Sequence, residues 1–320
     1  MKHRILEGTD LKVSSICLGG GSYGDKLGKK EVFYQLDEFA DAGGNFIDTA
    51  NVYCRWATGD NSSERLIGEW MNSRKRKNDM IIATKGAHYD AAHPEVSRVR
   101  EDAIRKDLEE SLTTLGTDCI PLYWLHRDDE ALPAGEIVEW CEKLVKEGKI
   151  RYYGFSNWKR NRAEAAISYA KKEGFKGPCA VSNRYSLAYI RPEAATGDPT
   201  LVMTDTAYLR WHEETGFPLI PYTSAAGGYY EKLDRGLPVS SVYQNRVNEA
   251  RFQYLKELRS ETGRTMTELS ISYLTGLDFP VIPVVSATKP EQLKELISAA
   301  DFTLPKQAVR RLRDLEDMKL

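Results

Sequence analysis

Residues 45–53 of this 320-residue chain read NFIDTANVY. The preceding run DAGG, at 41–44, is typical of the end of a helix, and the apolar portion 45–47 predicts a short buried strand. We therefore expect Asp48 and Tyr53 in the loop that follows this strand. A carboxylate and a phenol at a strand exit are suited to proton transfer, but Asp also caps turns there and Tyr packs against edges. The stretch alone leaves both interpretations open.

Short apolar segments alternate with segments of helical periodicity along most of the chain. A hairpin is expected at 3–6 and 11–13, strands at 15–18, 45–47, 80–84, 119–125, 150–154, 178–182, 217–222 and 280–285, and helices at 29–42, 61–71, 97–115, 133–147 and 160–173. Eight strands that alternate with helices predict an α/β protein with a closed (β/α)8 barrel, the TIM barrel. We expect one domain, residues 1–320, with an N-terminal β-hairpin and a C-terminal helical extension.

Composition excludes several classes of protein. Lys and Arg total 45 and Asp and Glu 47, for a formal charge of −2, so neither nucleic acid nor an anionic membrane is expected as a partner. No apolar run approaches the ~20 residues of a membrane span, and no secretory segment follows the N-terminus, so we expect a soluble, cytoplasmic protein. The five cysteines are scattered without a C-x-x-C, which argues against a disulfide framework or a zinc site. The sequence carries no signal for the oligomeric state.

The barrel fold would bring distant polar residues together, because the residues after each strand converge on one rim. Asp48, Tyr53, Lys85 and His126 all follow predicted strands. Taken singly, Lys85 could be a surface lysine and His126 an ordinary loop histidine. Together they suit protonation of a carbonyl oxygen: the Lys85 ammonium would lower the pKa of Tyr53 from ~10, Asp48 would keep Lys85 charged, and His126 would orient the substrate oxygen. Because the chain holds no hydride, this chemistry requires a nicotinamide cofactor.

Motifs in the expected order carry a resemblance to a known family. FIDTA (46–50) followed by Tyr53, ATK (83–85), LH (125–126) and GFSNW (154–158) resemble the aldo-keto reductase superfamily from residue 15 to about 300. The resemblance implies that Tyr53 is the general acid/base, that Lys85 and Asp48 tune it, and that His126 orients the substrate. It also implies that NADP(H) binds extended across the barrel mouth without a Rossmann fold.

The same resemblance implies a set of cofactor-binding residues. Ser156 and Asn157 correspond to the pair that holds the nicotinamide carboxamide, and Tyr222 corresponds to the aromatic residue that stacks on the ring. The segment TSAAGG at 223–228, with Thr223, Ser224 and Gly228, would wrap the pyrophosphate. An ordinary loop of small residues is the alternative interpretation of that segment.

Departures from the family pattern concern the nicotinamide and the 2′-phosphate. Asn183 stands where the family commonly carries a longer Gln. SATK at 286–289, including Ser286, Thr288 and Lys289, stands where many relatives have Gly-Ala-Arg, so Thr288 and Lys289 would hold the phosphate less directionally than an Arg. Gln292 falls where an adenine-side contact is expected. NADP(H) is therefore the expected cofactor, with NAD(H) as the alternative.

The sequence describes the substrate only in outline. Aromatic and hydrogen-bonding residues are expected around the mouth, at Tyr23, Arg55, Trp56, His88, Arg127, Tyr185, Tyr189, Tyr229 and Tyr230. They suit a small-molecule aldehyde or ketone, including a sugar-like one, or simply cover the barrel top. No metal is expected, because no histidines lie at ligand spacing. Two other functions stay open: a slow-turnover, cofactor-binding regulatory subunit, and a lyase or isomerase that forms a Schiff base at Lys85.

Overall fold

The computed structural model describes residues 1–76, 79–191 and 198–317 and contains two sheets. The strands β1 (His3–Ile5) and β2 (Lys12–Ser14) form an antiparallel hairpin. The second sheet has seven strands, in the order β8-β7-β6-β5-β4-β3-β9. Their bounds are β3 Cys17–Gly19, β4 Phe46–Asp48, β5 Ile81–Gly86, β6 Ile120–Leu125, β7 Ile150–Ser156, β8 Val181–Ser182 and β9 Val284–Val285.

The parallel sheet closes on itself. Leu219 forms isolated parallel bridges with both Val181, in β8, and Val281, which precedes β9. The segment 217–222, expected as the seventh strand, thus fills the barrel position between β8 and β9. It is not the continuous strand that the sequence predicts. Pro218 and Pro221 explain the interruption, because proline has no N–H to donate to a neighbouring strand. The predicted (β/α)8 barrel is confirmed.

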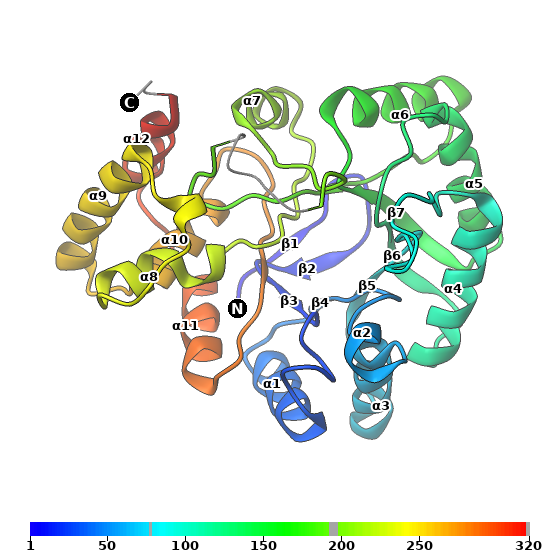
Figure 1. Ribbon diagram of the computed structural model, residues 1–320, viewed down its shortest axis with the longest axis horizontal. Coiled ribbons are helices and arrows are strands. Elements are labelled where there is room, and N and C mark those ends of the chain that lie inside the picture. The colour runs from blue at the N-terminus through cyan, green and yellow to red at the C-terminus, as the bar shows by residue number, and fades with distance from the viewer. Residues whose placement is uncertain (77–78, 192–197, 318–320) are drawn as a thin grey trace.

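Helices surround the strands (Figure 1). The longer ones are α1 Lys29–Asp41, α3 Ser62–Arg74, α4 Glu101–Leu115, α5 Ala134–Lys146, α6 Arg160–Glu173, α7 Thr206–Thr215, α9 Arg246–Thr262, α10 Met266–Thr275, α11 Pro290–Asp301 and α12 Lys306–Asp317. Shorter ones are α2 Arg55–Thr58, η2 Ala226–Gly228, α8 Tyr229–Asp234 and η3 Ser241–Tyr243. The helix α12 packs against α9, which gives the expected C-terminal helical extension.

The hairpin closes the end of the barrel at which the strands begin. Leu6, Leu11 and Val13 are buried in one cluster with barrel residues such as Phe46 and Trp124. The N–H of Ser14 donates to the side chain of Asn45, the residue before β4, at 2.8 Å. The opposite end, where the strands finish, is left for polar side chains.

Several element boundaries differ from those predicted. Asp48 is the last residue of β4 and Lys85 lies within β5, because backbone pairing continues through Asp48 with Ala83 and through Lys85 with Trp124. The helix expected from residue 97 begins at Glu101. Asn61 precedes α3, but its side chain donates to the carboxylate of Glu64 at 2.8 Å and caps no backbone N–H.

Three further features bear on function. Within the described residues, every helix is too short or too polar to cross a bilayer. The same residues contain no group of His, Cys, Asp or Glu arranged to hold a metal ion. All five cysteines are free thiols.

Candidate active site

An ion pair between neighbouring strands forms the base of the site. The Lys85 ammonium donates to Asp48 Oδ2 at 2.5 Å and to the carbonyl oxygen of Thr49 at 2.6 Å. The side chains are 3% and 5% exposed, respectively. The contact arises because β4 and β5 are adjacent and parallel, so their ends meet at the same rim.

Lys85 remains a cation in this environment. Burial by itself lowers the pKa of its ammonium, but Asp48 and Tyr53 outweigh that effect and raise the pKa above the ordinary value. A Schiff base needs a neutral amine. The geometry therefore disfavours the lyase or isomerase alternative.

Tyr53 lies in the turn after β4, with the Lys85 Nζ 4.7 Å from its ring centroid. We expected the ammonium to lower the pKa of the phenol. The pKa of Tyr53 is instead raised, because burial penalises the phenolate more than Lys85 stabilises it, and the negative charge of Asp48 adds to the increase. The expected direction was wrong because burial disfavours the phenolate more strongly than the Lys85 ammonium favours it. Tyr53 is accordingly a protonated phenol near neutral pH.

His126 follows β6 directly and is buried. Its ring lies edge-on to that of Tyr53, with centroids 5.7 Å apart, and its Nδ1 has no hydrogen-bond partner. Burial, with the nearby Arg127 guanidinium, holds the pKa of His126 well below its ordinary value. A neutral imidazole beside the phenol can hydrogen-bond a carbonyl oxygen without competing for the proton.

A second histidine, His88, packs against the first. The rings of His88 and His126 are edge-on at 4.7 Å, and His88 Nδ1 lies 2.8 Å from the carbonyl oxygen of Tyr89. Burial lowers the pKa of His88 to about 4. The sequence placed His88 only among the general residues of the mouth. Its position just past β5, which ends at Gly86, was the signal that links it to the same rim.

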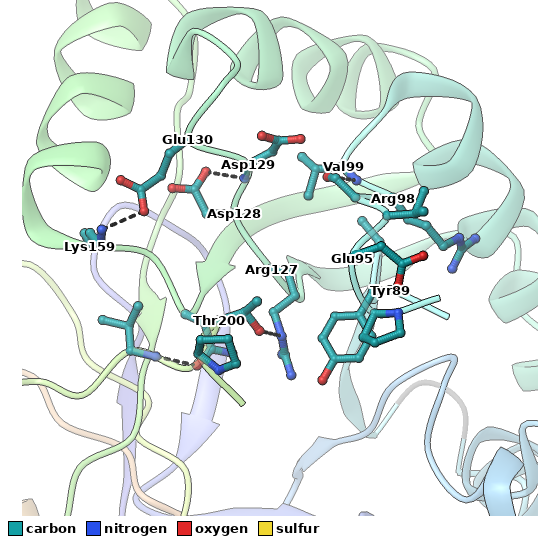
Figure 2. A pocket seen from close by; sticks show the side chains of 17 residues that line it. Tyr89, Glu95, Arg98, Val99, Arg127, Asp128, Asp129, Glu130, Lys159 and Thr200 are labelled. Carbon is teal, nitrogen blue, oxygen red and sulfur yellow. Dashed lines mark hydrogen bonds and ion pairs between the residues drawn. The ribbon is translucent and has the colours of Figure 1, made fainter. Parts of the chain in front are cut away.

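A cavity of about 300 Å³ opens beside these residues (Figure 2). Arg127 and Asn157 line it, but none of Asp48, Tyr53, Lys85 and His126 does. The Arg127 guanidinium donates to Asp198 at 2.9 Å and to Thr200 at 2.7 Å, and the Tyr89 hydroxyl donates to Asp198 at 2.6 Å.

Asp198 and Thr200 could not be identified from the sequence, because the chain around them has no periodic pattern. Asp198, Thr200 and Val202, which line the cavity or contact its walls, come from the loop between β8 and α7. Only the fold brings that loop against Arg127.

The residues expected at the nicotinamide lie together where β7 and the segment 217–222 end. Asn157 has a left-handed backbone, with φ of 61°. Its Oδ1 accepts from the Tyr222 hydroxyl at 2.6 Å and from the Val202 N–H at 3.2 Å, and its Nδ2 donates to Ser156 Oγ at 3.2 Å. The structure therefore brings Ser156, Asn157 and Tyr222 into one contact group.

Asn183 has a different set of contacts. Its Oδ1 accepts from the N–H of Trp158 at 3.2 Å, and its Nδ2 donates to the carbonyl oxygen of the same residue at 3.0 Å. Both ends of its amide are thus used to hold the loop after β7. This arrangement accounts for the shorter side chain, which meets a neighbouring backbone rather than reaching into the mouth.

The segment 223–228 has mixed exposure: Thr223 and Gly227 are exposed, whereas Ser224 and Ala226 are buried. Thr223, Ala226, Gly227 and Gly228 have positive φ values of 58°, 50°, 62° and 78°. A Cβ added at Gly227 or Gly228 would meet nothing within 4 Å. Backbone N–H groups in such a turn can bind an anion such as a pyrophosphate, but those of Ala226 and Gly228 already donate to the carbonyl oxygens of Thr223 and Ala225, each at 2.8 Å. The Ser224 hydroxyl instead donates to the carbonyl oxygen of Pro221 at 2.8 Å.

The residues expected at the adenosine end lie at the start of α11. Ser286, Thr288 and Lys289 are exposed. The side-chain oxygen of Gln292 accepts from the N–H of Thr288 at 2.9 Å and from that of Lys289 at 3.1 Å, so Gln292 caps the helix. The Lys289 ammonium is left to the solvent side, where it can meet a phosphate.

Not all residues expected around the mouth lie there. Tyr23, Tyr229 and Tyr230 are buried, and Trp56 is 64% exposed. The Arg55 guanidinium turns toward the backbone and toward α4. The aromatic character predicted for the mouth was therefore overestimated.

Comparisons with known proteins agree with this geometry. The sequence profile described as the Aldo/keto reductase family matches residues 15–317. The chain is 27% identical to the uncharacterized oxidoreductase YrpG of Bacillus subtilis, covering 98% of this chain and 96% of that protein. It is 29% identical to an aryl-alcohol dehydrogenase [NADP(+)] of Phanerodontia chrysosporium, covering 98% and 85%.

A solved structure has the same fold. The crystal structure of the thermostable aldo-keto reductase Tm1743, in complex with the inhibitor epalrestat, superimposes with a TM-score of 0.73 at 24% identity, and covers 98% of this chain and 100% of that one. The family match over nearly the whole chain agrees with the barrel fold. The chain therefore belongs to the aldo/keto reductase family and is an NAD(P)H-dependent oxidoreductase.

Proposed function

We propose that this protein reduces the carbonyl group of an aldehyde or ketone to an alcohol with NADP(H), with Tyr53 as the proton donor. The observation that carries the proposal is the contact group of Asp48, Lys85, Tyr53 and His126 at the rim where the barrel strands end. In barrel enzymes this rim holds the active site.

The proposed roles follow from charge and protonation. Tyr53 is a protonated phenol, so it can supply the proton that the carbonyl oxygen takes up as hydride reaches the carbon. The Lys85 ammonium stabilises the resulting phenolate, and Asp48 keeps Lys85 charged. The neutral His126 would orient the carbonyl oxygen by donating a ring N–H to it. Solvent returns the proton to Tyr53 after the alcohol leaves.

A bound nicotinamide would supply the hydride and leave oxidised. Ser156 and Asn157 would hold its carboxamide and Tyr222 its ring. The left-handed backbone around Gly227 and Gly228 would receive the pyrophosphate. The space beside Gly227 and Gly228 supports this placement of the pyrophosphate, since no side chain fills it.

The residues at the N-terminal end of α11 would bind the 2′-phosphate and the adenine. Lys289 and Thr288 are exposed there, and an ammonium beside a hydroxyl suits a phosphate. The relative from Phanerodontia chrysosporium, whose name includes NADP(+), supports the same preference. NADP(H) is therefore proposed over NAD(H).

Two considerations bear on the substrate. The cavity walls carry Arg98, Arg127, Asp128 and Glu130, which suits a polar or polyhydroxylated carbonyl compound. Relatives named as aryl-alcohol dehydrogenases favour an aromatic aldehyde instead. A panel of 4-nitrobenzaldehyde and glyceraldehyde, compared by kcat/KM, decides between these classes.

The test of the proposal is a titration with NADPH and NADH, followed by a single turnover with 4-nitrobenzaldehyde. We expect tighter binding of NADPH and oxidation of the bound cofactor on addition of aldehyde. Failure to bind either cofactor would refute the proposal. Binding with a fast single turnover but slow steady-state turnover would favour the regulatory-subunit alternative.

A further inference from the structure

The turn that carries Tyr53, residues 51–55, is held by the side chains of Arg55 and Glu110. Arg55 contacts the backbone of the turn, and Glu110 joins the turn to α4. We propose that Arg55 and Glu110 are positioning residues that hold Tyr53 at the distance and angle needed for proton transfer. This inference rests on the proposed function.

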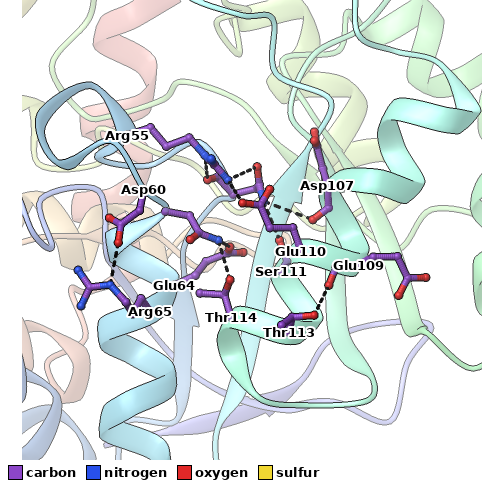
Figure 3. A network of polar contacts seen from close by, with 12 residues as sticks. Arg55, Asp60, Glu64, Arg65, Asp107, Glu109, Glu110, Ser111, Thr113 and Thr114 are labelled. Carbon is purple, nitrogen blue, oxygen red and sulfur yellow. Dashed lines mark hydrogen bonds and ion pairs between the residues drawn. The ribbon is translucent and has the colours of Figure 1, made fainter.

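The contacts hold the chain on both sides of Tyr53, at Asn51 before it and at Arg55 after it. Arg55 Nε donates to the carbonyl oxygen of Asn51 at 2.8 Å, and its terminal nitrogen donates to Asn51 Oδ1 at 3.2 Å and to Glu110 Oε1 at 2.5 Å. The other oxygen of Glu110 accepts from Asn51 Nδ2 at 3.1 Å. Glu110 therefore holds the residue two before Tyr53 and the residue two after it. Figure 3 shows Glu110 reaching toward Arg55, whereas its neighbour Glu109 points away.

The turn contains a strained residue that needs such support. Cys54, between Tyr53 and Arg55, has a φ of 66°, in the left-handed region. A non-glycine residue in this region is strained and persists only where the surrounding contacts determine its conformation. Without the contacts of Glu110 and Arg55, the turn would relax, and Tyr53 would move with it.

The contacts of Asn51 also connect the turn that carries Tyr53 to β5, the strand that carries Lys85. The N–H of Asn51 donates to the carbonyl oxygen of Lys85 at 3.0 Å. Asn51 is thus the point at which the tyrosine turn meets β5, and Glu110 fixes the Asn51 side chain. A change at Glu110 is transmitted to the spacing between Tyr53 and Lys85.

A plain surface ion pair is the competing explanation. Arg55 and Glu110 side chains are 32% and 41% exposed, and exposed pairs add little to stability. The two explanations differ in what a substitution changes. A surface pair would alter neither stability nor rate, whereas a positioning pair would alter the rate with little change in stability, because small misplacements of a reacting group slow the chemistry strongly.

The test compares Glu110→Gln with Glu109→Gln, which makes the same change on the same helix at a residue paired with Lys149 on the surface. Arg55→Lys is compared with Arg65→Lys, whose guanidinium pairs with Asp60. We expect Glu110→Gln and Arg55→Lys to lower the single-turnover rate at saturating NADPH by about 10-fold. NADPH affinity and melting temperature should match the controls.

Two readouts separate positioning from general loosening. Because the Lys85 ammonium lowers the pKa of Tyr53 against the effect of burial, a displaced Tyr53 should have a still higher pKa, and the alkaline limb of the rate profile should move to higher pH in Glu110→Gln. Adding Cys54→Gly should restore part of the lost rate, since glycine adopts a positive φ without strain.

Equal rates for Glu110→Gln and Glu109→Gln would overturn the inference. If Glu110→Gln does not fold, Arg55→Lys decides the question by the same measurements. A parent protein that reduces no carbonyl refutes the proposed function instead, and the positioning role with it. An active parent with unaffected variants refutes the positioning role alone.

Discussion

Replacing Asp48 with Asn should lower the free energy of unfolding, because it breaks a buried ion pair. The change removes the negative charge that lies 2.5 Å from the Lys85 ammonium, in a contact whose side chains are 5% and 3% exposed. Removing one partner of a buried pair costs about 3–5 kcal/mol, because the other charge stays buried and uncompensated. The Thr49 carbonyl oxygen still accepts from Lys85 at 2.6 Å, so we expect the lower figure of about 3 kcal/mol.

The expected loss is measurable by heating. At roughly 2–4 °C for each kcal/mol in a chain of more than 150 residues, the melting temperature should fall by about 6–12 °C. Asp37→Asn is a matched control, because Asp37 pairs with Arg74 at a partly exposed position and should cost at most about 1 kcal/mol. Circular dichroism melts of both variants make the comparison.

The double variant Asp48→Asn with Lys85→Met provides the decisive test. It removes both charges and leaves an apolar side chain of similar length, and such replacements of buried pairs are often neutral. We therefore expect a melting temperature near that of the parent but a single-turnover reduction rate at least about 100-fold lower, because the phenolate of Tyr53 loses its cation. A double variant no more stable than Asp48→Asn, or one that reduces aldehyde at the parental rate, would refute this reasoning.

Three further outcomes are expected. Tyr53→Phe should lower the single-turnover rate by ~10²-fold or more while NADPH affinity stays unchanged; near-parental rates in a folded, cofactor-loaded variant would place the proton donor elsewhere. Lys289→Glu should weaken NADPH binding much more than NADH binding in fluorescence titrations, whereas equal losses would show that Lys289 does not contact the 2′-phosphate. Burial lowers the pKa of His212 to about 4, below the ~6.5 of an unfolded histidine, so its contribution to stability is complete above pH 6.5 and is lost as the pH falls toward 4. Urea unfolding at pH 7 and pH 5 should show a smaller loss for His212→Phe than for the parent, and equal losses would contradict this assignment.

Much of the architecture was readable from local patterns. Strands such as Ile120–Leu125 and helices such as Ala134–Lys146 lie within one or two residues of their predicted bounds, because each has a continuous apolar run or a clear helical period. The prediction was weaker at 217–222, where Pro218 and Pro221 interrupt the hydrogen-bonded ladder although the apolar pattern is that of a strand.

The identities of the rim residues were predictable, but their electrostatics were not. Because parallel strands end at one rim, Asp48, Lys85 and His126 could be placed together from their positions after apolar runs. The direction in which the pKa of Tyr53 shifts could not be predicted, since it depends on how far burial outweighs the Lys85 ammonium. Burial of a particular hydroxyl is a property of the packed molecule.

The local pattern of apolar and polar residues was thus enough to establish the barrel, the family and the residues at its rim, because periodicity and strand-end position act over short distances along the chain. Contacts between remote segments needed the folded chain. Glu110 on α4 meets Arg55, and Asp198 meets Arg127, only after the barrel has brought those segments together. Such pairs have no local signature, because a charged residue on an exposed helix or loop looks the same in the sequence whether it faces solvent or a distant partner.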